Sequence, residues 1–170
     1  MILRPAEPAD FSAVLALNEE SVQFLSPLSR EHLERLHAEA ELHAVIESEG
    51  AVCAFLLAFR EGTDYDSVNY RWFQQRFQRF LYVDRVVVSR CMQGRGAGAA
   101  LYRHVFAHAA ETSVPVVTCE YDVDPPNEVS ERFHARFGFR EVGRQRVADG
   151  RKAVSLQASV LTATAGTQER

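Results

Sequence analysis

The sequence has few of the features that mark exported or membrane proteins. Its first residues lack a basic segment followed by an apolar run, and its longest apolar run, residues 51–59, is far shorter than the ~20 residues of a membrane span. It has three cysteines, an odd number without metal-ligand spacing. These absences predict a cytoplasmic protein with reduced thiols, with neither a leader peptide nor a membrane segment.

The chain also has fewer basic than acidic residues. The chain has 19 lysines and arginines against 23 aspartates and glutamates, which gives a formal net charge of -4. Such a chain has no overall field that attracts nucleic acid or an anionic membrane, so we expect neither as a partner. The arginines among the aromatic residues of 70–80 therefore indicate a packed helix with a solvated face, not a nucleic-acid surface. Any anion must therefore be bound by a local group of hydrogen-bond donors or positive charges.

The length allows one domain and excludes a second. At 170 residues, of which 46% are hydrophobic, the chain can fill a single core. We expect one domain over residues 1–161 and a polar, disordered tail over residues 162–170. No internal repeat is visible in the sequence.

Periodicity and turn residues predict alternating helices and strands. Glu49-Gly50 and Asp149-Gly150 are hairpin turn sequences, and Ser29 is placed to cap a helix. The expected strands cover residues 2–4, 43–48, 51–59, 81–88, 114–121, 140–147 and 152–161. The expected helices cover residues 8–22, 29–40, a short stretch within 62–80, 98–111 and 127–137. In the third helix, residues 73, 77 and 80 share one face.

The most informative pattern follows the most apolar predicted strand. Gly94, Gly96 and Gly98 lie between that strand and a helix, where missing Cβ atoms allow a tight turn and expose consecutive backbone N–H groups. The positive end of the helix points at the same place, which is typical of a phosphate site. Gln93 and Arg95 add side-chain donors. An ordinary glycine-rich turn is the structural alternative.

A dinucleotide site is a second interpretation of this loop. Gly94, Gly96 and Ala99 satisfy G-x-G-x-x-A, and Glu120 follows about twenty residues on at a strand end. In that fingerprint the first glycine closely follows the strand, whereas here five residues separate it from Val88. This strand, loop and helix also stand in the middle of the chain, after two predicted helices and a predicted hairpin. Both features count against the dinucleotide interpretation.

The loop resembles the acetyl-CoA loop of the GNAT superfamily of N-acetyltransferases, Gln/Arg-x-x-Gly-x-Gly/Ala, here Gln93-Gly94-Arg95-Gly96-Ala97-Gly98. A second family signature, a strand followed by Asn, a helix and a terminal Gly-Phe, is similar to residues 116–139, with Asn127 and Gly138-Phe139. The two signatures stand in the family's order and separation. The resemblance covers the chain from Leu3 to about Leu161.

This resemblance implies an α/β fold with a mixed, mostly antiparallel sheet of about seven strands flanked by helices. Strands 81–88 and 114–121 would splay apart into a wedge for acetyl-CoA. The implied cofactor-binding residues are Val86, Val87, Val88, Gln93, Gly94, Arg95, Gly96, Ala97, Gly98, Ala99 and Asn127. For Asn127, a helix cap is the alternative role. We expect no metal site, because His104 and His108 stand i, i+4 without an evident third ligand.

The implied reaction is direct acetyl transfer to an amine, which needs a base, an oxyanion donor and a proton for the departing thiolate. Asp84 is the candidate base. By the two-residue period it shares a strand face with Tyr82, Val86 and Val88, and it aligns with an acidic residue of many family members. An aspartate paired structurally with an arginine is the alternative.

His134 stands where the family usually has a tyrosine that protonates the thiolate. An imidazole is also a competent proton donor, so His134 is the second catalytic candidate. A polar helix residue without catalytic duty is the alternative.

The implied acceptor is a primary amine of a small molecule or peptide, and the sequence does not identify it. Residues 65–80 lead into the Asp84 strand and are predicted to form one wall of the acceptor site. A domain that holds acyl-CoA as a sensor or scaffold, without turnover, is the alternative function. The oligomeric state stays open, a homodimer included.

Overall fold

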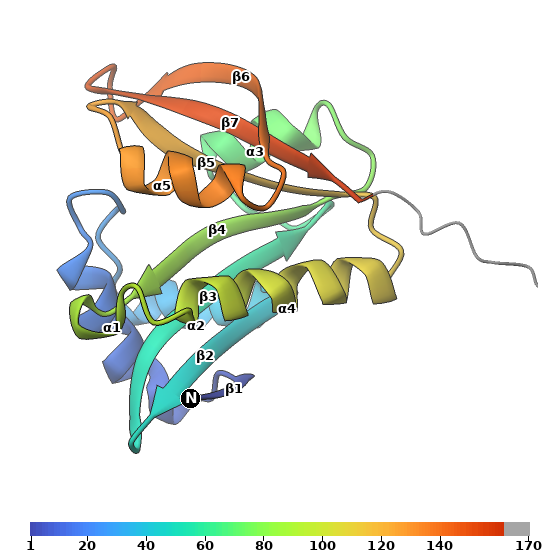
Figure 1. The fold of residues 1–170 in the computed structure, drawn as a ribbon. Coiled ribbons are helices and arrows are strands. Elements are labelled where there is room, and N and C mark those ends of the chain that lie inside the picture. Colours follow the sequence, from blue (N-terminus) through green and yellow to red (C-terminus); the bar gives the residue numbers. More distant parts are fainter. Residues whose placement is uncertain (162–170) are drawn as a thin grey trace, which may run out of the picture.

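The computed structural model describes residues 1–161, and the tail predicted for residues 162–170 lies outside them (Figure 1). Seven strands form one sheet in the order β1-β2-β3-β4-β5-β7-β6. All neighbouring strands are antiparallel except the parallel pair β4 and β5. This topology confirms the predicted mixed, mostly antiparallel sheet, and it differs from the parallel sheet of a dinucleotide-binding fold.

The strands agree with their predicted positions to within a few residues. They are β1 (Ile2–Pro5), β2 (Leu42–Ser48), β3 (Ala51–Arg60), β4 (Leu81–Val88), β5 (Val116–Asp124), β6 (Arg140–Val147) and β7 (Lys152–Val160). The α-helices are α1 (Phe11–Glu20), α2 (Arg30–Glu39), α3 (Val68–Gln74), α4 (Ala97–Glu111) and α5 (Glu128–Ala135). None of the helices within residues 1–161 has the length and apolar character needed to cross a membrane.

Local sequence decides where several elements start and turn. The Ser29 hydroxyl accepts a hydrogen bond from the His32 N–H at 3.2 Å, so Ser29 caps α2 as predicted. Glu49 and Gly50 adopt φ angles of 54° and 78°, which form the predicted hairpin turn between β2 and β3.

The predicted helical face in the aromatic segment is wrong. Because α3 ends at Gln74, only Phe73 of the three predicted face residues lies in the helix. Phe77 and Phe80 follow in the segment that leads to β4. Phe73 and Phe80 are fully buried in the same hydrophobic cluster. Burial of this segment against the sheet, not a continuous helix, therefore explains the aromatic spacing.

Helices cover both faces of the sheet (Figure 1). On the face covered by α1 and α2, here called the α1–α2 face, Phe55 and Leu57 of β3 pack into one hydrophobic cluster. On the opposite face, here called the α4 face, Leu56 and Ala58 pack into a second cluster with α4. The alternation along β3 explains its nearly continuous apolar sequence, since both of its faces are buried.

Strands β4 and β5 separate soon after they meet. Their register contains two pairs, Leu81 with Val117 and Tyr82 with Thr118. Beyond these pairs the strands diverge, with α5 and the β6–β7 hairpin on one side of the gap and β4 on the other (Figure 1). The predicted splayed pair is therefore present, at the centre of the sheet.

Candidate active site

A cleft of about 1480 Å³ occupies the wedge between β4 and β5. Its walls come from the loop between α1 and α2, the start of α3, β4, the start of α4, β5, α5 and β7. The sequence-predicted residues that line it are Asp84, Val86, Val87, Val88, Gln93, Gly94, Gly96, Ala97, Gly98, Ala99, Asn127 and His134. Arg95 is exposed and does not line the cleft. Twelve of the thirteen predicted residues thus meet in one place.

The β4 strand presents a free backbone edge to the cleft. From Val83 to Val88 the strand pairs with β3 on one side, while its register with β5 stops at Tyr82. Unpaired N–H and C=O groups of a strand edge can bind an extended ligand as if it were a further strand. The predicted role of the valines at 86, 87 and 88 fits this edge.

The glycine loop places backbone donors at the start of α4. Gly94 and Gly96 have φ angles of 75° and 86°, a left-handed conformation that side-chain-bearing residues rarely adopt. The Ala100 N–H donates to the Gly96 carbonyl at 2.9 Å, so the N–H groups of residues 97–99 precede the first intrahelical hydrogen bond. These donors and the positive end of a 15-residue helix suit a pyrophosphate.

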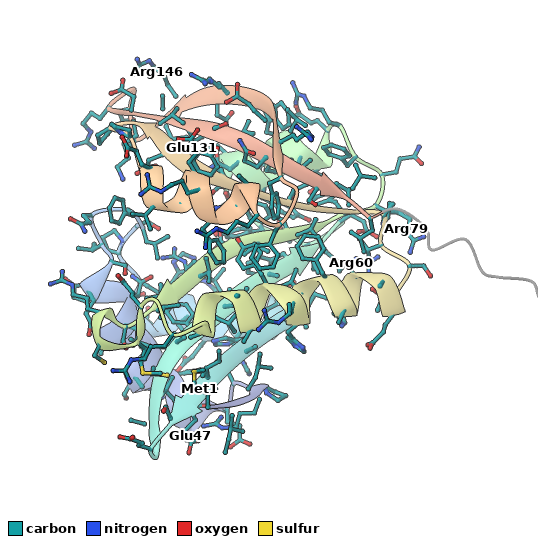
Figure 2. The ribbon with its side chains drawn as sticks, in the orientation of Figure 1. Met1, Glu47, Arg60, Arg79, Glu131 and Arg146 are labelled. Carbon is teal, nitrogen blue, oxygen red and sulfur yellow. The ribbon has the colours of Figure 1, made fainter. Side chains whose placement is uncertain are left out.

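α4 and α5 are held together by an aromatic cluster whose side chains fill the space between them (Figure 2). A Cβ added at Gly98 would lie 3.4 Å from the ring of Phe133 on α5, so this position of α4 packs directly against α5.

Asn127 caps α5. Its side-chain oxygen accepts a hydrogen bond from the Ser130 N–H at 3.1 Å, and its own N–H donates to the Asp122 carbonyl at 2.9 Å. The cap considered from the sequence is confirmed. The residue also lines the cleft, so a contact with a bound cofactor is compatible with the cap.

A β-bulge interrupts β4 at the predicted base. Leu57 of β3 pairs with Arg85 and Ala58 pairs with Val83, which leaves Asp84 without a partner on β3. At this point β4 therefore has one residue more than β3, and such an extra residue is the defining feature of a β-bulge. Bulges re-aim side chains, and this one re-aims Asp84.

The bulge corrects the predicted strand face of Asp84. Tyr82 packs into the cluster of the α1–α2 face, whereas Val86 and Val88 pack with the cluster of the α4 face. The two-residue period therefore fails across residue 84, and Asp84 does not share one face with all three residues. It lies near Tyr82, whose hydroxyl is 3.4 Å from Asp84 Oδ1.

Asp84 has one hydrogen-bonded oxygen and one oxygen that faces a cation without a hydrogen bond. Oδ1 accepts a hydrogen bond from the Tyr65 hydroxyl at 2.8 Å, and Oδ2 lies 3.2 Å from Arg85 Nε. Burial raises the pKa of Asp84, and the positive charge of Arg85 opposes that rise. The arginine-paired aspartate considered from the sequence is thus present.

Arg85 of β4 also forms hydrogen bonds with α1 and with the loop between α1 and α2. Its Nη1 donates to Asn18 Oδ1 at 2.8 Å and to the Ser26 carbonyl at 2.9 Å, and its Nη2 donates to Ser26 Oγ at 2.7 Å. The side chain is 4% exposed. One buried guanidinium therefore links the Asp84 carboxylate to this loop.

A second carboxylate, Glu120 on β5, lies beside Asp84. Glu120 Oε1 accepts hydrogen bonds from the Tyr82 hydroxyl and from Asn69 Nδ2, both at 2.9 Å. Burial, followed by the charge of Asp84, raises the pKa of Glu120 to about 8. From the sequence, Glu120 is a candidate only as a dinucleotide ligand, and its possible role as an acid or base is not predicted. Its position at the end of a buried strand was the available indication.

His134 is almost fully buried and is held at both ring nitrogens. Its Nδ1 lies 2.7 Å from the Ser130 carbonyl, an acceptor, so Nδ1 carries a proton. Its Nε2 lies 2.6 Å from the Tyr102 hydroxyl. Burial lowers the pKa of His134 to about 4, which leaves the ring neutral with Nε2 accepting from Tyr102.

This geometry bears against the predicted acid role of His134, which stays a prediction. A neutral imidazole whose single proton is bound to a backbone carbonyl has no proton ready for a departing thiolate. The side chain instead orients the Tyr102 hydroxyl, which also lines the cleft. The sequence offered no indication of this partner, because Tyr102 lies on α4, far from α5 along the chain.

The three cysteines are free thiols, of which Cys53 and Cys119 are buried and Cys91 is exposed. Within residues 1–161 no group of three or more metal-binding side chains is present.

The glycine loop at a helix N-terminus, the splayed strand pair and the buried carboxylates between them define an α/β protein with a site suited to a phosphate-bearing ligand. The acetyltransferase (GNAT) family model matches residues 11–139, which is most of the chain. The protein belongs to the acetyltransferase (GNAT) family.

One curated relative is phosphinothricin N-acetyltransferase of Streptomyces coelicolor, 48% identical over 60 residues. The alignment covers 35% of this chain, and the chain spans only 33% of the length of that relative.

Solved structures share the fold at low identity. Ard1 from Thermoplasma volcanium has a TM-score of 0.76 at 16% identity, covering 95% of this chain and 97% of that one. The ribosomal-protein-S18-alanine N-acetyltransferase of Escherichia coli has a TM-score of 0.73 at 16% identity, covering 99% of each chain. Naa50 of Arabidopsis thaliana, in complex with the bisubstrate analogue CoA-Ac-MVNAL, has 0.71 at 14%, covering 93% and 97%.

Proposed function

We propose that this protein is an acetyl-CoA-dependent N-acetyltransferase that moves the acetyl group directly to a primary amine of a small molecule or peptide. The observation that carries the proposal is the single cleft that joins three parts. These are the free β4 edge, the backbone donors at the start of α4, and two buried carboxylates. Membership of the GNAT family supports the same reaction.

The chain's own groups fit a pyrophosphate carrier with an amide-bearing arm. The N–H groups of residues 97–99 and the helix dipole suit the pyrophosphate, and the β4 edge at Val86 and Val88 suits the amides. Arg90, Arg132 and Arg136 also line the cleft, and they supply positive charge that the sequence analysis did not assign. A net acidic protein can thereby bind an anion locally.

Acetyl-CoA supplies an activated thioester, and the protein's task is to bind it and to ready the amine. An alkyl ammonium, with a reference pKa near 10.4, must lose a proton before its nitrogen can attack. Asp84 and Glu120 are the carboxylates placed to receive that proton. A CoA-type thiolate, comparable to cysteine with a reference pKa near 8.5, can leave without a proton from neutral His134.

The aromatic segment contributes to the acceptor end. Tyr65, Asp66, Ser67 and Asn69 line the cleft beside Asp84, as predicted for one wall of the acceptor site. A cytoplasmic location stays a prediction, which the three free cysteines support. The oligomeric state, a homodimer included, stays open.

Release of CoA tests the proposed function. The protein is mixed with acetyl-CoA and, in separate wells, spermidine, phosphinothricin, single amino acids and short peptides with free N-termini. Free thiol is then followed with a colorimetric reagent. We expect release with at least one amine class above the amine-free rate. Binding of acetyl-CoA without release would favour the sensor alternative, and absence of binding would overturn the cofactor assignment.

A further inference from the structure

We propose that Glu120, not Asp84, binds the acceptor ammonium and takes its proton, and that Asp84 is a positioning residue. This inference rests on the proposed acetyl transfer and assigns one step of it. Glu120 lies two residues beyond Thr118, the last β5 residue paired with β4, so it stands where the two strands open.

The two ends of the wedge lie on opposite faces of the sheet. Val86 and Val88 pack toward the α4 face, where the glycine loop begins α4. Glu120 contacts Tyr82, a residue of the α1–α2 face cluster, and Asn69 from α3. A thioester held along the β4 edge from the α4 side would thus be open to an amine from the side of Glu120.

The carboxylates differ in what their oxygens contact. Asp84 has Tyr65 at one oxygen and Arg85 at the other, so its charge is already paired. Asp84 Oδ2 and Glu120 Oε2 are both shielded from solvent and have no hydrogen bond among residues 1–161. Asp84 Oδ2 nevertheless faces the Arg85 cation at 3.2 Å, whereas Glu120 Oε2 has no ion-pair partner among these residues. An unsatisfied buried carboxylate oxygen costs free energy unless a donor reaches it. An ammonium N–H group is such a donor.

Tyr82 connects the two acids. Its one hydroxyl proton serves the nearer acceptor, Glu120 at 2.9 Å, and not Asp84 at 3.4 Å. Asp84 therefore acts on Glu120 through its negative charge and through the shared hydroxyl. That charge helps to keep a proton on Glu120 in the empty site. The positive charge of an arriving ammonium favours the ionised carboxylate, so Glu120 first releases this proton to water and can then accept one from the ammonium.

Several other groups surround Glu120 and contribute to its charge state. Asp122 follows on β5 and is paired with Lys152 of β7 at 3.0 Å. The remaining titratable or charged neighbours are Tyr65, Tyr82, Asp84, Arg85, Tyr102 and Cys119. Arg85 is bound to Asp84 and Lys152 to Asp122, so neither cation neutralises Glu120 directly.

Acetyl transfer from the thioester to the amine moves two protons, forms one carbon–nitrogen bond and breaks one carbon–sulfur bond. Glu120 Oε2 takes one proton from the ammonium, and the freed lone pair forms a bond to the thioester carbonyl carbon. The carbon–sulfur bond breaks, and its electron pair leaves with sulfur. The second amine proton ends on the thiolate, and Glu120 returns its proton to water.

Paired variants separate the two carboxylates. Glu120→Gln keeps the size of the side chain, and we expect it to lower kcat by about 10²–10⁴-fold without changing the affinity for CoA. Asp84→Asn should keep kcat within about tenfold and move the acidic limb of kcat/KM to lower pH, because a negative charge beside Glu120 is lost. Glu131→Gln, on the exposed side of α5 (Figure 2), is the matched control.

A binding experiment with a simple alkylammonium tests the assignment without knowledge of the natural acceptor. Butylammonium is added to the CoA-bound protein, and the side-chain carboxyl carbons are followed by ¹³C NMR. We expect a Glu120 resonance to shift in the parent and in Asp84→Asn, and this response to vanish in Glu120→Gln.

Two results would overturn the assignment. The first is a kcat of Glu120→Gln close to the parent's, with Asp84→Asn losing most activity. The second is no Glu120 response to butylammonium in a protein that binds CoA. Failure of the proposed function looks different, because the parent itself would then fail to bind acetyl-CoA or to release CoA.

Discussion

At the scale of single residues, burial controls the charge state of the ionisable groups in the cleft. His134 is 4% exposed and stays neutral because its pKa is lowered to about 4. Glu120 is affected in the opposite sense, since burial of a carboxyl favours its protonated form. The two residues therefore couple folding to pH with opposite signs.

The stability of the protein should report the His134 effect directly. Unfolded histidine takes up a proton near pH 6.5, whereas folded His134 does so only near pH 4. Between these values the unfolded state binds more protons, so the His134 contribution to stability is lost as pH falls from about 6.5 toward 4. We expect the stability difference between the parent and His134→Gln to shrink by about 2 kcal/mol from pH 7 to pH 5, measured by urea unfolding.

Glu120→Gln is the opposing control for this measurement. Folded Glu120 holds its proton to about pH 8, well above the reference value of a glutamate, so the folded state binds more protons between these values. The parent should therefore gain stability relative to Glu120→Gln as pH falls over the same range. A parent and His134→Gln that respond identically to pH would contradict the neutral, buried imidazole.

At the scale of elements, the glycine loop and α4 form the unit with the sharpest sequence pattern. Gly96 has a φ of 86° and no atom within 4 Å of an added Cβ, so its backbone conformation, not crowding, requires glycine. Gly50 in the β2–β3 turn has a φ of 78° and equally open surroundings. The two glycines thus form a matched pair, one in the cleft and one remote from it.

The Gly96→Glu and Gly50→Glu variants should separate backbone strain from cofactor binding. A left-handed non-glycine residue costs about 1–2 kcal/mol, so both variants should lose similar stability. Acetyl-CoA at a hundredfold excess over Kd should return roughly 2.7 kcal/mol to the parent and to Gly50→Glu, and little to Gly96→Glu. Urea unfolding with and without acetyl-CoA measures this. Equal stabilisation of all three proteins would contradict a phosphate site at the loop.

The β4 bulge marks the limit of prediction at this scale. Strand positions, the hairpin turns and the Ser29 cap follow from local pattern, and the structure confirms them. The bulge at Asp84 depends on how β3 and β4 pair, which an alternating pattern in one strand does not encode. The same holds for α3, whose aromatic residues are spaced by burial against the sheet.

At the scale of the whole molecule, the cleft passes between two parts of one sheet. β1 to β4 carry α1, α2 and α4, while β5, β7 and β6 lie beyond the opening with α5 (Figure 1). Because the opening lies within the sheet, residues from both faces can reach it. This arrangement brings Glu120, Tyr82 and Asn69 together from three separate elements.

Long-range contacts explain what the sequence could not predict about the site. The glycine loop is continuous in sequence, so its residues could be predicted to lie together, and all but Arg95 line the cleft. The contact of Tyr102 with His134 and that of Asn69 with Glu120 join residues far apart in the chain. Such pairs decide which groups the Glu120 carboxylate and the His134 imidazole contact.

The central claim is that the wedge between β4 and β5 holds acetyl-CoA, and a crystal structure of the protein with CoA tests it most directly. We expect the pantetheine amides to hydrogen-bond to the backbone of Val86 and Val88, and the pyrophosphate to lie against the N–H groups of residues 97–99. CoA bound at another surface, with the β4 edge still free, would contradict the account.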